Sequence, residues 1–340
     1  MKKTVKWLIA AALLTVIGAV ISFSALAASG FNMSLLNTAS FVENTYTLTE
    51  SFNDISLSTD TADIILIPTQ EREVRVVCYE YEGHYHSVAV KDGTLTLTKP
   101  SDAYVSGIFN FTVTSPKISV YIPEGEYGTL KVETDTADVY VPKEFTFAGI
   151  DISTDTGDSA IYSSSKNHIK INTDTGDVLI SGVNTDILDV KAHTADVTVS
   201  SVNCKGNASI VTTTGDLKIN TLVASSLFTS ASTGDVDIKG ATVAKGFTVE
   251  RSTGDVTLKR CVAGSFTVTT DTGDVTFEAC DCAALSVTTS TGDVCGSLLS
   301  PKIFSANSKT GDVRIPTGQI GGLAVINTST GDIYFEIISD

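Results

Sequence analysis

The chain has 340 residues, of which 7% are aromatic and 18% charged, and its net charge is −16. That acidic balance excludes nucleic acid as an expected partner, because phosphate binding needs an excess of Lys and Arg. The many Thr, Val and Ile residues predict an all-β fold, since β-branched side chains pack well on a pleated surface.

The amino terminus is predicted to be a membrane anchor. Three lysines precede an uncharged run of 22 residues at positions 7–28. A helix of that length crosses roughly 30 Å of hydrocarbon, and the basic residues favour the cytoplasmic side. A signal peptide cleaved near Ala25–Ala27, which would make the protein secreted, is the alternative. Residues 1–28 are thus the expected transmembrane helix of a single-pass cell-membrane protein with an extracytoplasmic C-terminal part, and residues 29–48 a spacer.

Residues 49–128 are predicted to form a small N-terminal β cap that holds one early copy of the repeat described below. Within it, "SVAV" and "TLTLT" flank Asp92-Gly93, a strong signal for a tight hairpin turn. The 75 residues from Asp63 to Asp138 also fit four degenerate coils. We favour the cap, because the terminal units of repeat proteins are usually atypical.

Residues 129–340 repeat the phrase T-[GA]-D every 19 or 20 residues. We call the aspartate of this phrase the marker aspartate. Apolar residues alternate with polar ones before and after each marker, and a period of two indicates strands. The chain is therefore predicted to be a single-stranded parallel β-solenoid with coils of about 19–20 residues, stacked about 4.8 Å apart.

The Gly-Asp pair of each repeat is predicted to be a structural corner. The alternation changes phase across the pair, so the chain must bend there, and glycine adopts backbone angles that a Cβ resists. A second corner near "SGVN", residues 181–184, completes the coil. The predicted corner residues are Gly157, Asp158, Gly176, Asp177, Gly215, Asp216, Gly234, Asp235, Gly254, Asp255, Gly273, Asp274, Gly292, Asp293, Gly311, Asp312, Gly331 and Asp332.

Threonines lie four and two residues before most markers. Both positions share the phase of the buried apolar residues, so both are expected to point inward as hydroxyl ladders. An ice-binding surface needs flat rows of outward threonines, and this expectation argues against one.

These features resemble the bacterial putative-adhesin family of exported solenoids, a domain of unknown function. The resemblance is carried by the basic start, the apolar anchor, the early "STDTADI" and the T-G-D-V coils, and it covers essentially the whole chain. It implies a β-solenoid at the bacterial envelope, commonly membrane-anchored, and it assigns no catalytic residue. Ala62, Ala137 and Ala195 replace the corner glycine, so those three corners are expected to turn differently.

The sequence contains no nucleophile elbow, no zinc-protease motif and no phosphate loop. A carbohydrate-active β-helix enzyme is an alternative, because such enzymes place carboxylates on a solenoid face. Their sites normally occupy long loops, which coils of constant length leave no room for. The chain is therefore predicted to be no enzyme and to need no cofactor.

Calcium binding is the main alternative function. Where the phrase reads D-T-[GA]-D, stacked aspartates could offer the six to eight oxygens that calcium takes. The competing interpretation is that each marker aspartate bonds backbone N–H groups at its own corner. His84 and His86 would share one strand face, but two ligands do not fix a metal. The weak calcium candidates are Asp135, Asp138, Asp155, Asp158, Asp174, Asp177, Asp271 and Asp274, with Asp60 and Asp63 in the early copy.

The leading hypothesis is a non-enzymatic, membrane-anchored, extracytoplasmic β-solenoid that serves as an adhesin-like or envelope-scaffold interaction surface. A rigid repetitive face offers many weak contacts, which add through multivalency. The expected partner is a protein or a cell-wall or surface component. The six cysteines are expected to be free thiols that fill the core. Tyr79, Tyr81, Tyr85 and Tyr104 form a candidate docking patch, as aromatic residues are enriched at interfaces.

Overall fold

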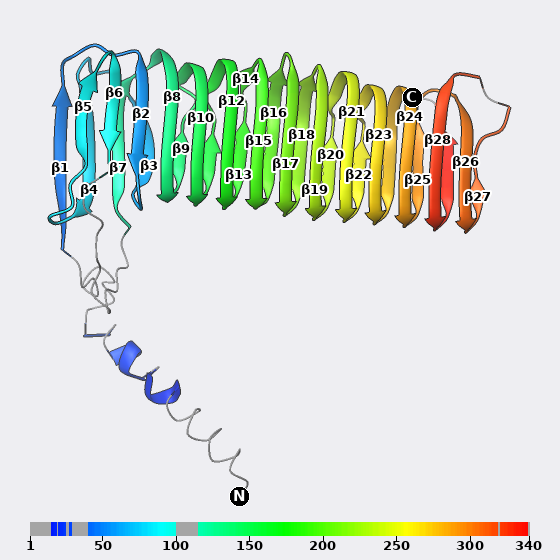
Figure 1. Ribbon diagram of the computed structural model, residues 1–340, viewed down its shortest axis with the longest axis horizontal. Helices are drawn as coiled ribbons and strands as arrows, with labels where there is room; N and C mark the ends of the chain where they lie inside the picture. Colours follow the sequence, from blue (N-terminus) through cyan, green and yellow to red (C-terminus); the bar gives the residue numbers. More distant parts are fainter. Residues whose placement is uncertain are drawn as a thin grey trace, which may run out of the picture.

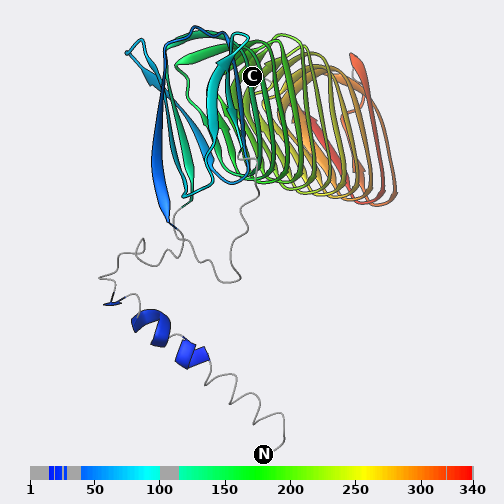
Figure 2. The same cartoon turned by 60° about the vertical axis from the view of Figure 1, so that its left-hand side comes forward.

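The computed structural model describes residues 15–18, 20–24, 27–28, 40–99, 115–318 and 320–338. Most of these belong to strands, which join into one sheet that winds into a parallel β-solenoid. Its coils stand side by side in one straight stack (Figure 1), and an oblique view shows them one behind another (Figure 2). The predicted all-β solenoid with coils of about 20 residues is therefore confirmed.

Each coil contains a leading strand that runs into the marker corner and a trailing strand that leaves it. The leading strands are β2 (Asp54–Thr59), β8 (Gly125–Thr136), β10 (Phe145–Thr156), β12 (Ser164–Thr175), β15 (Ile187–Thr194), β17 (Asn207–Thr214), β19 (Ser226–Thr233), β21 (Thr242–Thr253), β23 (Val262–Thr272), β24 (Val275–Thr291), β26 (Lys302–Thr310) and β28 (Gly322–Thr330). The trailing strands are β3 (Asp63–Thr69), β9 (Val139–Val141), β11 (Ser159–Ile161), β13 (Val178–Ser181), β16 (Val197–Cys204), β18 (Leu217–Ala224), β20 (Val236–Lys239), β22 (Val256–Lys259), β25 (Val294–Leu298), β27 (Val313–Arg314) and β29 (Ile333–Ile337), while the first part of the long β24 also serves as one. The short β14 (Asn184–Thr185) pairs with β16.

The core lies between the leading and trailing strands, where apolar side chains of successive coils stack on one another. Ile169 and Ile171 on β12 face inward with Val178 and Ile180 on β13, and each is at most 1% exposed. Equivalent residues lie 19 positions apart, since Val178 pairs with Val197. Full burial of one such side chain stabilises the fold by roughly 1.5–3 kcal/mol, so the alternating pattern drives the stacking.

The marker corner needs glycine for two reasons. At Gly176 the φ angle is +128°, which L residues rarely adopt. A Cβ built there would also lie 2.2 Å from the carbonyl oxygen of Gly157 in the preceding coil. Ala137 and Ala195 do not have a positive φ, and both side chains are buried, so these corners turn differently, as expected.

The threonine prediction is half wrong. Thr154, four residues before its marker, is buried, but Asp155 and Thr156 are both exposed. Strand β10 matches β12 at Thr154 and again at Thr156 but not at the residue between them, so the backbone begins to turn two residues earlier than the Gly-Asp pair. The threonines two residues before the markers consequently form an outward row.

A second corner lies five residues after the marker. There the chain passes through a single residue with positive φ, such as Gly182 at 71° and Gly240 at 67°. Thr221 and Arg260 occupy the same place in their coils, with φ of 62° and 48°. The region around 181–184 therefore closes the coil, as predicted.

The N-terminal cap consists of β1 (Phe41–Leu48), β4 (Val74–Tyr81), β5 (Ser87–Lys91), β6 (Thr94–Thr98) and β7 (Lys117–Pro123). The prediction of a spacer over 29–48 is wrong for β1, which pairs with β4 along its whole length. Strands β5 and β6 form an antiparallel hairpin around Asp92 and Gly93, as the sequence predicts. Strand β4 pairs antiparallel with both β1 and β7. The alternative of four degenerate coils is wrong, because Ile64 pairs directly with Val139.

Spatial order differs from chain order at both ends of the stack. At the cap, the coil of β2 and β3 lies between β6 and β7 on one side and β8 and β9 on the other. At the far end, β28 lies between β24 and β26, and β29 lies between β25 and β27. The last coil in sequence is therefore the second last in space.

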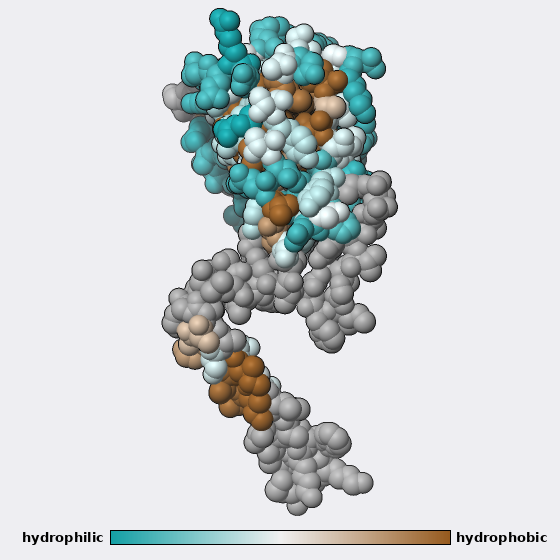
Figure 3. Space-filling view, turned by 90° about the vertical axis from the view of Figure 1, so that its left-hand side faces the viewer, coloured by the Kyte–Doolittle hydropathy of each residue, from teal (hydrophilic) through white to brown (hydrophobic). Residues whose placement is uncertain are grey.

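The predicted anchor at residues 1–28 lies largely outside the described residues. The parts that are described, 15–18, 20–24 and 27–28, are helical. They leave Val16, Val20 and Phe23 more than half exposed and form the brown segment below the end-on view of the cap (Figure 3). Within the described ranges, no helix combines the length and hydropathy needed to span a bilayer.

Candidate interaction surface

The marker aspartates form a continuous hydrogen-bonded ladder along one edge of the solenoid. The backbone N–H of Asp177 donates to Asp158 Oδ1 at 2.7 Å, and that of Asp196 donates to Asp177 Oδ1 at 2.9 Å. Each carboxylate thus serves the neighbouring coil rather than its own corner, contrary to the competing interpretation above. In space the ladder runs Asp63, Asp138, Asp158, Asp177, Asp196, Asp216, Asp235, Asp255, Asp274, Asp293, Asp332 and Asp312.

Beside this ladder lie the aspartates three residues before the markers, of which Asp60 is half-buried and the others are exposed. Asp60 and Asp135 contact the same ammonium, Lys99 Nζ, at 2.7 and 3.6 Å. Across the described ranges, the calcium candidates do not come together in groups of three; the one such group of potential metal ligands lies in the cap. Calcium binding at the corners stays a prediction.

The outer side of the trailing-strand sheet carries a contiguous apolar face next to the cap. Val77 and Ile65 flank Ser119 in one row, which continues through Tyr140 and Ala160 to Leu179. A second row pairs Tyr121 with Ile67. The apolar face consists of Ile65, Ile67, Val77, Tyr121, Tyr140, Ala160, Tyr162 and Leu179, all of which are half-buried or exposed.

Aromatic side chains make up part of this face. Tyr140, which is 41% exposed, lies 5.6 Å from Tyr162 between ring centroids. Arg75 Cζ lies 4.2 Å from the centroid of the Tyr121 ring. At this distance the guanidinium cation is attracted to the negative face of the aromatic ring.

Beyond β13 the same row becomes polar. Its next members are Thr198, Lys218, Asp237, Thr257 and Thr276. At the far end the row continues through Cys295 to the exposed Tyr334 and then Arg314. Among the described residues, the longest apolar stretch of the row therefore lies in the capped part of the rod, although the coils themselves are alike.

The predicted tyrosine patch is only partly assembled. Tyr79 and Tyr81 lie on β4 in phase with Val77, and both pack on Phe41, with ring centroids 5.0 and 4.7 Å apart. Tyr85 is exposed in the turn before β5. Tyr104 lies outside the described residues.

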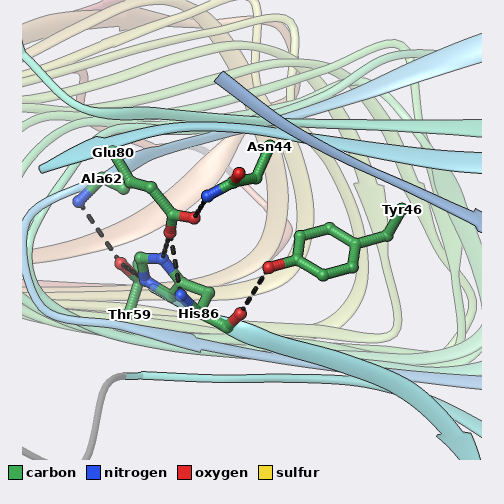
Figure 4. A network of polar contacts seen from close by, with 6 residues as sticks. All are labelled: Asn44, Tyr46, Thr59, Ala62, Glu80 and His86. Atoms are coloured by element: carbon green, nitrogen blue, oxygen red, sulfur yellow. Dashed lines mark hydrogen bonds and ion pairs between the residues drawn. The ribbon is translucent and has the colours of Figure 1, made fainter. Parts of the chain in front are cut away.

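A buried polar cluster, which no sequence motif predicted, closes the cap (Figure 4). His86 Nδ1 lies 2.6 Å from Glu80 Oε2, and His86 Nε2 lies 2.9 Å from Thr59 Oγ1. Asn44 Nδ2 donates to Glu80 Oε1 at 2.7 Å, and Tyr46 donates to the His86 carbonyl. His84 and His86 do not share a strand face, because both lie in the turn before β5 and only His86 is buried.

The cluster has the order of groups found in hydrolytic triads, a hydroxyl, an imidazole and a carboxylate. However, Thr59 and Glu80 are each 1% exposed and His86 is 7% exposed, so a substrate cannot reach the hydroxyl. Burial by itself raises the pKa of Glu80, but hydrogen bonds from His86 and Asn44 outweigh it and hold that pKa below its usual value. The geometry therefore indicates a charged carboxylate that fixes the turn.

The chain is similar to one known family and to several solved structures. The family model described as Toastrack DUF4097 matches residues 52–239 and 221–339. A "putative adhesin" of Bacteroides fragilis is 15% identical and covers 87% of this chain and 97% of its own, with a TM-score of 0.38. A "putative adhesin" of Parabacteroides distasonis is 16% identical, with coverages of 87% and 98% and a TM-score of 0.38. A "putative cell adhesion protein" of Clostridium sporogenes is 10% identical, with coverages of 88% and 100% and a TM-score of 0.23. Likeness at this level carries no functional argument, and no curated protein matches the chain.

Proposed function

The chain belongs to the Toastrack DUF4097 family, and from that premise we propose that it acts outside the bacterial cytoplasmic membrane as a non-enzymatic, adhesin-like interaction surface. The observation that carries the proposal is the apolar face beside the cap. Soluble monomers rarely leave contiguous apolar patches uncovered, and such patches often mark protein interaction sites.

The structure of the face suits binding. Its side chains stand on paired strands of a rigid stack, so few groups lose freedom when a partner docks. Tyrosine is enriched at interfaces, because its ring is apolar and its hydroxyl can still reach water or a partner. The face offers Tyr121 on β7, Tyr140 on β9 and Tyr162 directly after β11.

Anchoring through residues 1–28 is part of the same proposal. It is supported by the uncharged run at 7–28 and by exposed apolar side chains such as Val20 and Phe23. The 12 residues 29–40 between this run and β1 can span at most roughly 40 Å. The cap would then stay close to the bilayer, and a protein of the same membrane is the partner that this tether favours.

A double substitution tests the face. We expect Tyr140→Ser with Tyr162→Ser to remove the adduct that the full-length protein forms with a membrane protein when intact producing cells are treated with a chemical crosslinker. The melting temperature should change little, because neither side chain belongs to the core.

The matched control is Thr257→Ser with Thr276→Ser, in the same row of the same sheet, which should leave the adduct intact. An adduct that survives the tyrosine substitutions, or one formed with wall polymer instead, would contradict the proposal.

A further inference from the structure

The cap brings three side chains of metal-binding type into one buried space. Cys78 and Glu80 are two residues apart on β4, so both point to its inner face. The turn after β4 then returns His86 against them. One ligand atom from each of the three lies within 4.8 Å of the other two, and all three residues are buried. We propose that Cys78, Glu80 and His86 form a binding site for a divalent transition-metal ion of the zinc type.

The donor set selects the metal. A thiolate, an imidazole and a carboxylate are the ligands that zinc takes in proteins, whereas magnesium and calcium prefer oxygen alone. Three protein ligands also leave one tetrahedral position, which water fills in zinc sites of this kind.

Neighbouring side chains hold the donor groups in place, as the hydrogen-bond partners of ligands do in metal sites. Thr59 Oγ1 holds His86 Nε2 at 2.9 Å, which leaves Nδ1 directed at Glu80. Asn44 holds the other carboxylate oxygen, Glu80 Oε1, and leaves Oε2 directed at His86. In metal proteins, hydrogen-bond partners of the ligating imidazole and carboxylate groups fix the orientation of those ligands.

Cys78 differs from three other buried cysteines. The thiols of Cys204, Cys261 and Cys280 donate to backbone carbonyl oxygens. No hydrogen bond of the Cys78 thiol occurs among the described residues, and its sulfur lies within 4.8 Å of a Glu80 carboxylate oxygen. A cation bound between the sulfur and the carboxylate would favour the thiolate, because the cation would attract both negative groups.

Protons and charge balance when a metal ion replaces the thiol proton of Cys78. With no ion bound, a proton lies between His86 Nδ1 and Glu80 Oε2, and Cys78 carries its thiol proton. When M²⁺ binds, the ring proton moves to Nε2, where Thr59 Oγ1 accepts it, and the thiol proton leaves to solvent. Two negative ligands then neutralise the ion. Nδ1 and Oε2 would separate from 2.6 Å to roughly 3.3 Å, since each lies about 2.0–2.1 Å from tetrahedral zinc.

Cobalt(II) provides a test with a spectroscopic readout. The full-length protein, purified in detergent and freed of metal with a chelator, should develop a thiolate-to-cobalt charge-transfer band on titration with Co²⁺, and Zn²⁺ should abolish the band. Cys78→Ser should lose it. Cys282→Ser, which changes another buried cysteine, should retain it.

Zinc stoichiometry keeps the proposal testable if Cys78→Ser fails to fold. Competition between the wild-type chain and a chromophoric chelator should show one zinc ion held per chain. No charge-transfer band in the wild type, an unchanged band in folded Cys78→Ser, or no zinc held against the chelator would overturn the proposal.

Discussion

Gly234→Ala is expected to destabilise the solenoid by roughly 2–5 kcal/mol, which combines the cost of a positive φ with that of overpacking. Gly234 has φ of +125°, and a Cβ there would lie 2.1 Å from the carbonyl oxygen of Gly215. Both atoms belong to backbones held in register by β19 and β17. Neither coil can move away without breaking the hydrogen bonds of its own strands, so the clash lowers the free energy of unfolding. Urea unfolding followed by circular dichroism measures this loss.

Gly246→Ala is the matched control for this prediction. Gly246 lies on β21 without a positive φ, and the nearest atom to a new Cβ is Ser265 Oγ at 4.0 Å. Its substitution should change the free energy of unfolding by less than about 1 kcal/mol. Equal effects of the two substitutions would show that the corner imposes no special demand for glycine.

Arg251→Thr should raise the free energy of unfolding by about 1–3 kcal/mol, because it removes a buried charge without a partner. Arg251 is 5% exposed, and none of the three nitrogens of its guanidinium has a hydrogen-bond partner within the described part of the chain. It lies between Ala231 and Thr270 in the inward row where most coils carry threonine. Threonine at this place therefore restores the residue that the row otherwise uses.

The pH dependence gives this prediction a second readout. Burial lowers the pKa of Arg251 to about 10, well below its ordinary range, so the guanidinium is charged in the folded protein at neutral pH. A basic group whose pKa is lower in the folded than in the unfolded state destabilises the folded protein most at pH values below the folded pKa. This loss of stability becomes smaller as the pH rises through that pKa. The advantage of Arg251→Thr should therefore shrink above about pH 10. Lys239→Thr, at an exposed position of β20, should change stability little at either pH, and a loss of stability in Arg251→Thr would contradict the argument.

The coil could be predicted from the sequence because local chemistry determines it. The spacing of Asp158, Asp177 and Asp196 fixes the coil length, and the alternation around them fixes the strands. Thr156 was misplaced because strand parity does not foresee a residue that drops out of register before the corner. The order of coils at the ends depends on long-range pairing, such as β28 between β24 and β26, which no short pattern records.

The candidate sites depend on distant parts of the chain, so the sequence indicated them poorly. The polar cluster joins Thr59 on β2 to Glu80 and His86 across the cap, and these residues share no motif. The apolar face collects one or two residues from each of several coils and from the cap strands β4 and β7. Its signal was present two residues after the markers, at Tyr140, Ala160 and Leu179, but it appears only when the coils are aligned on the marker aspartate.

The most direct test of the interaction surface is site-specific photo-crosslinking in intact producing cells. A photoreactive residue in place of Tyr140 should capture a membrane protein of the same cell, whereas the same residue in place of Thr257, on the polar part of the same row, should capture nothing. Equal capture at both positions, or none at Tyr140 in a chain that reaches the cell surface, would contradict the account.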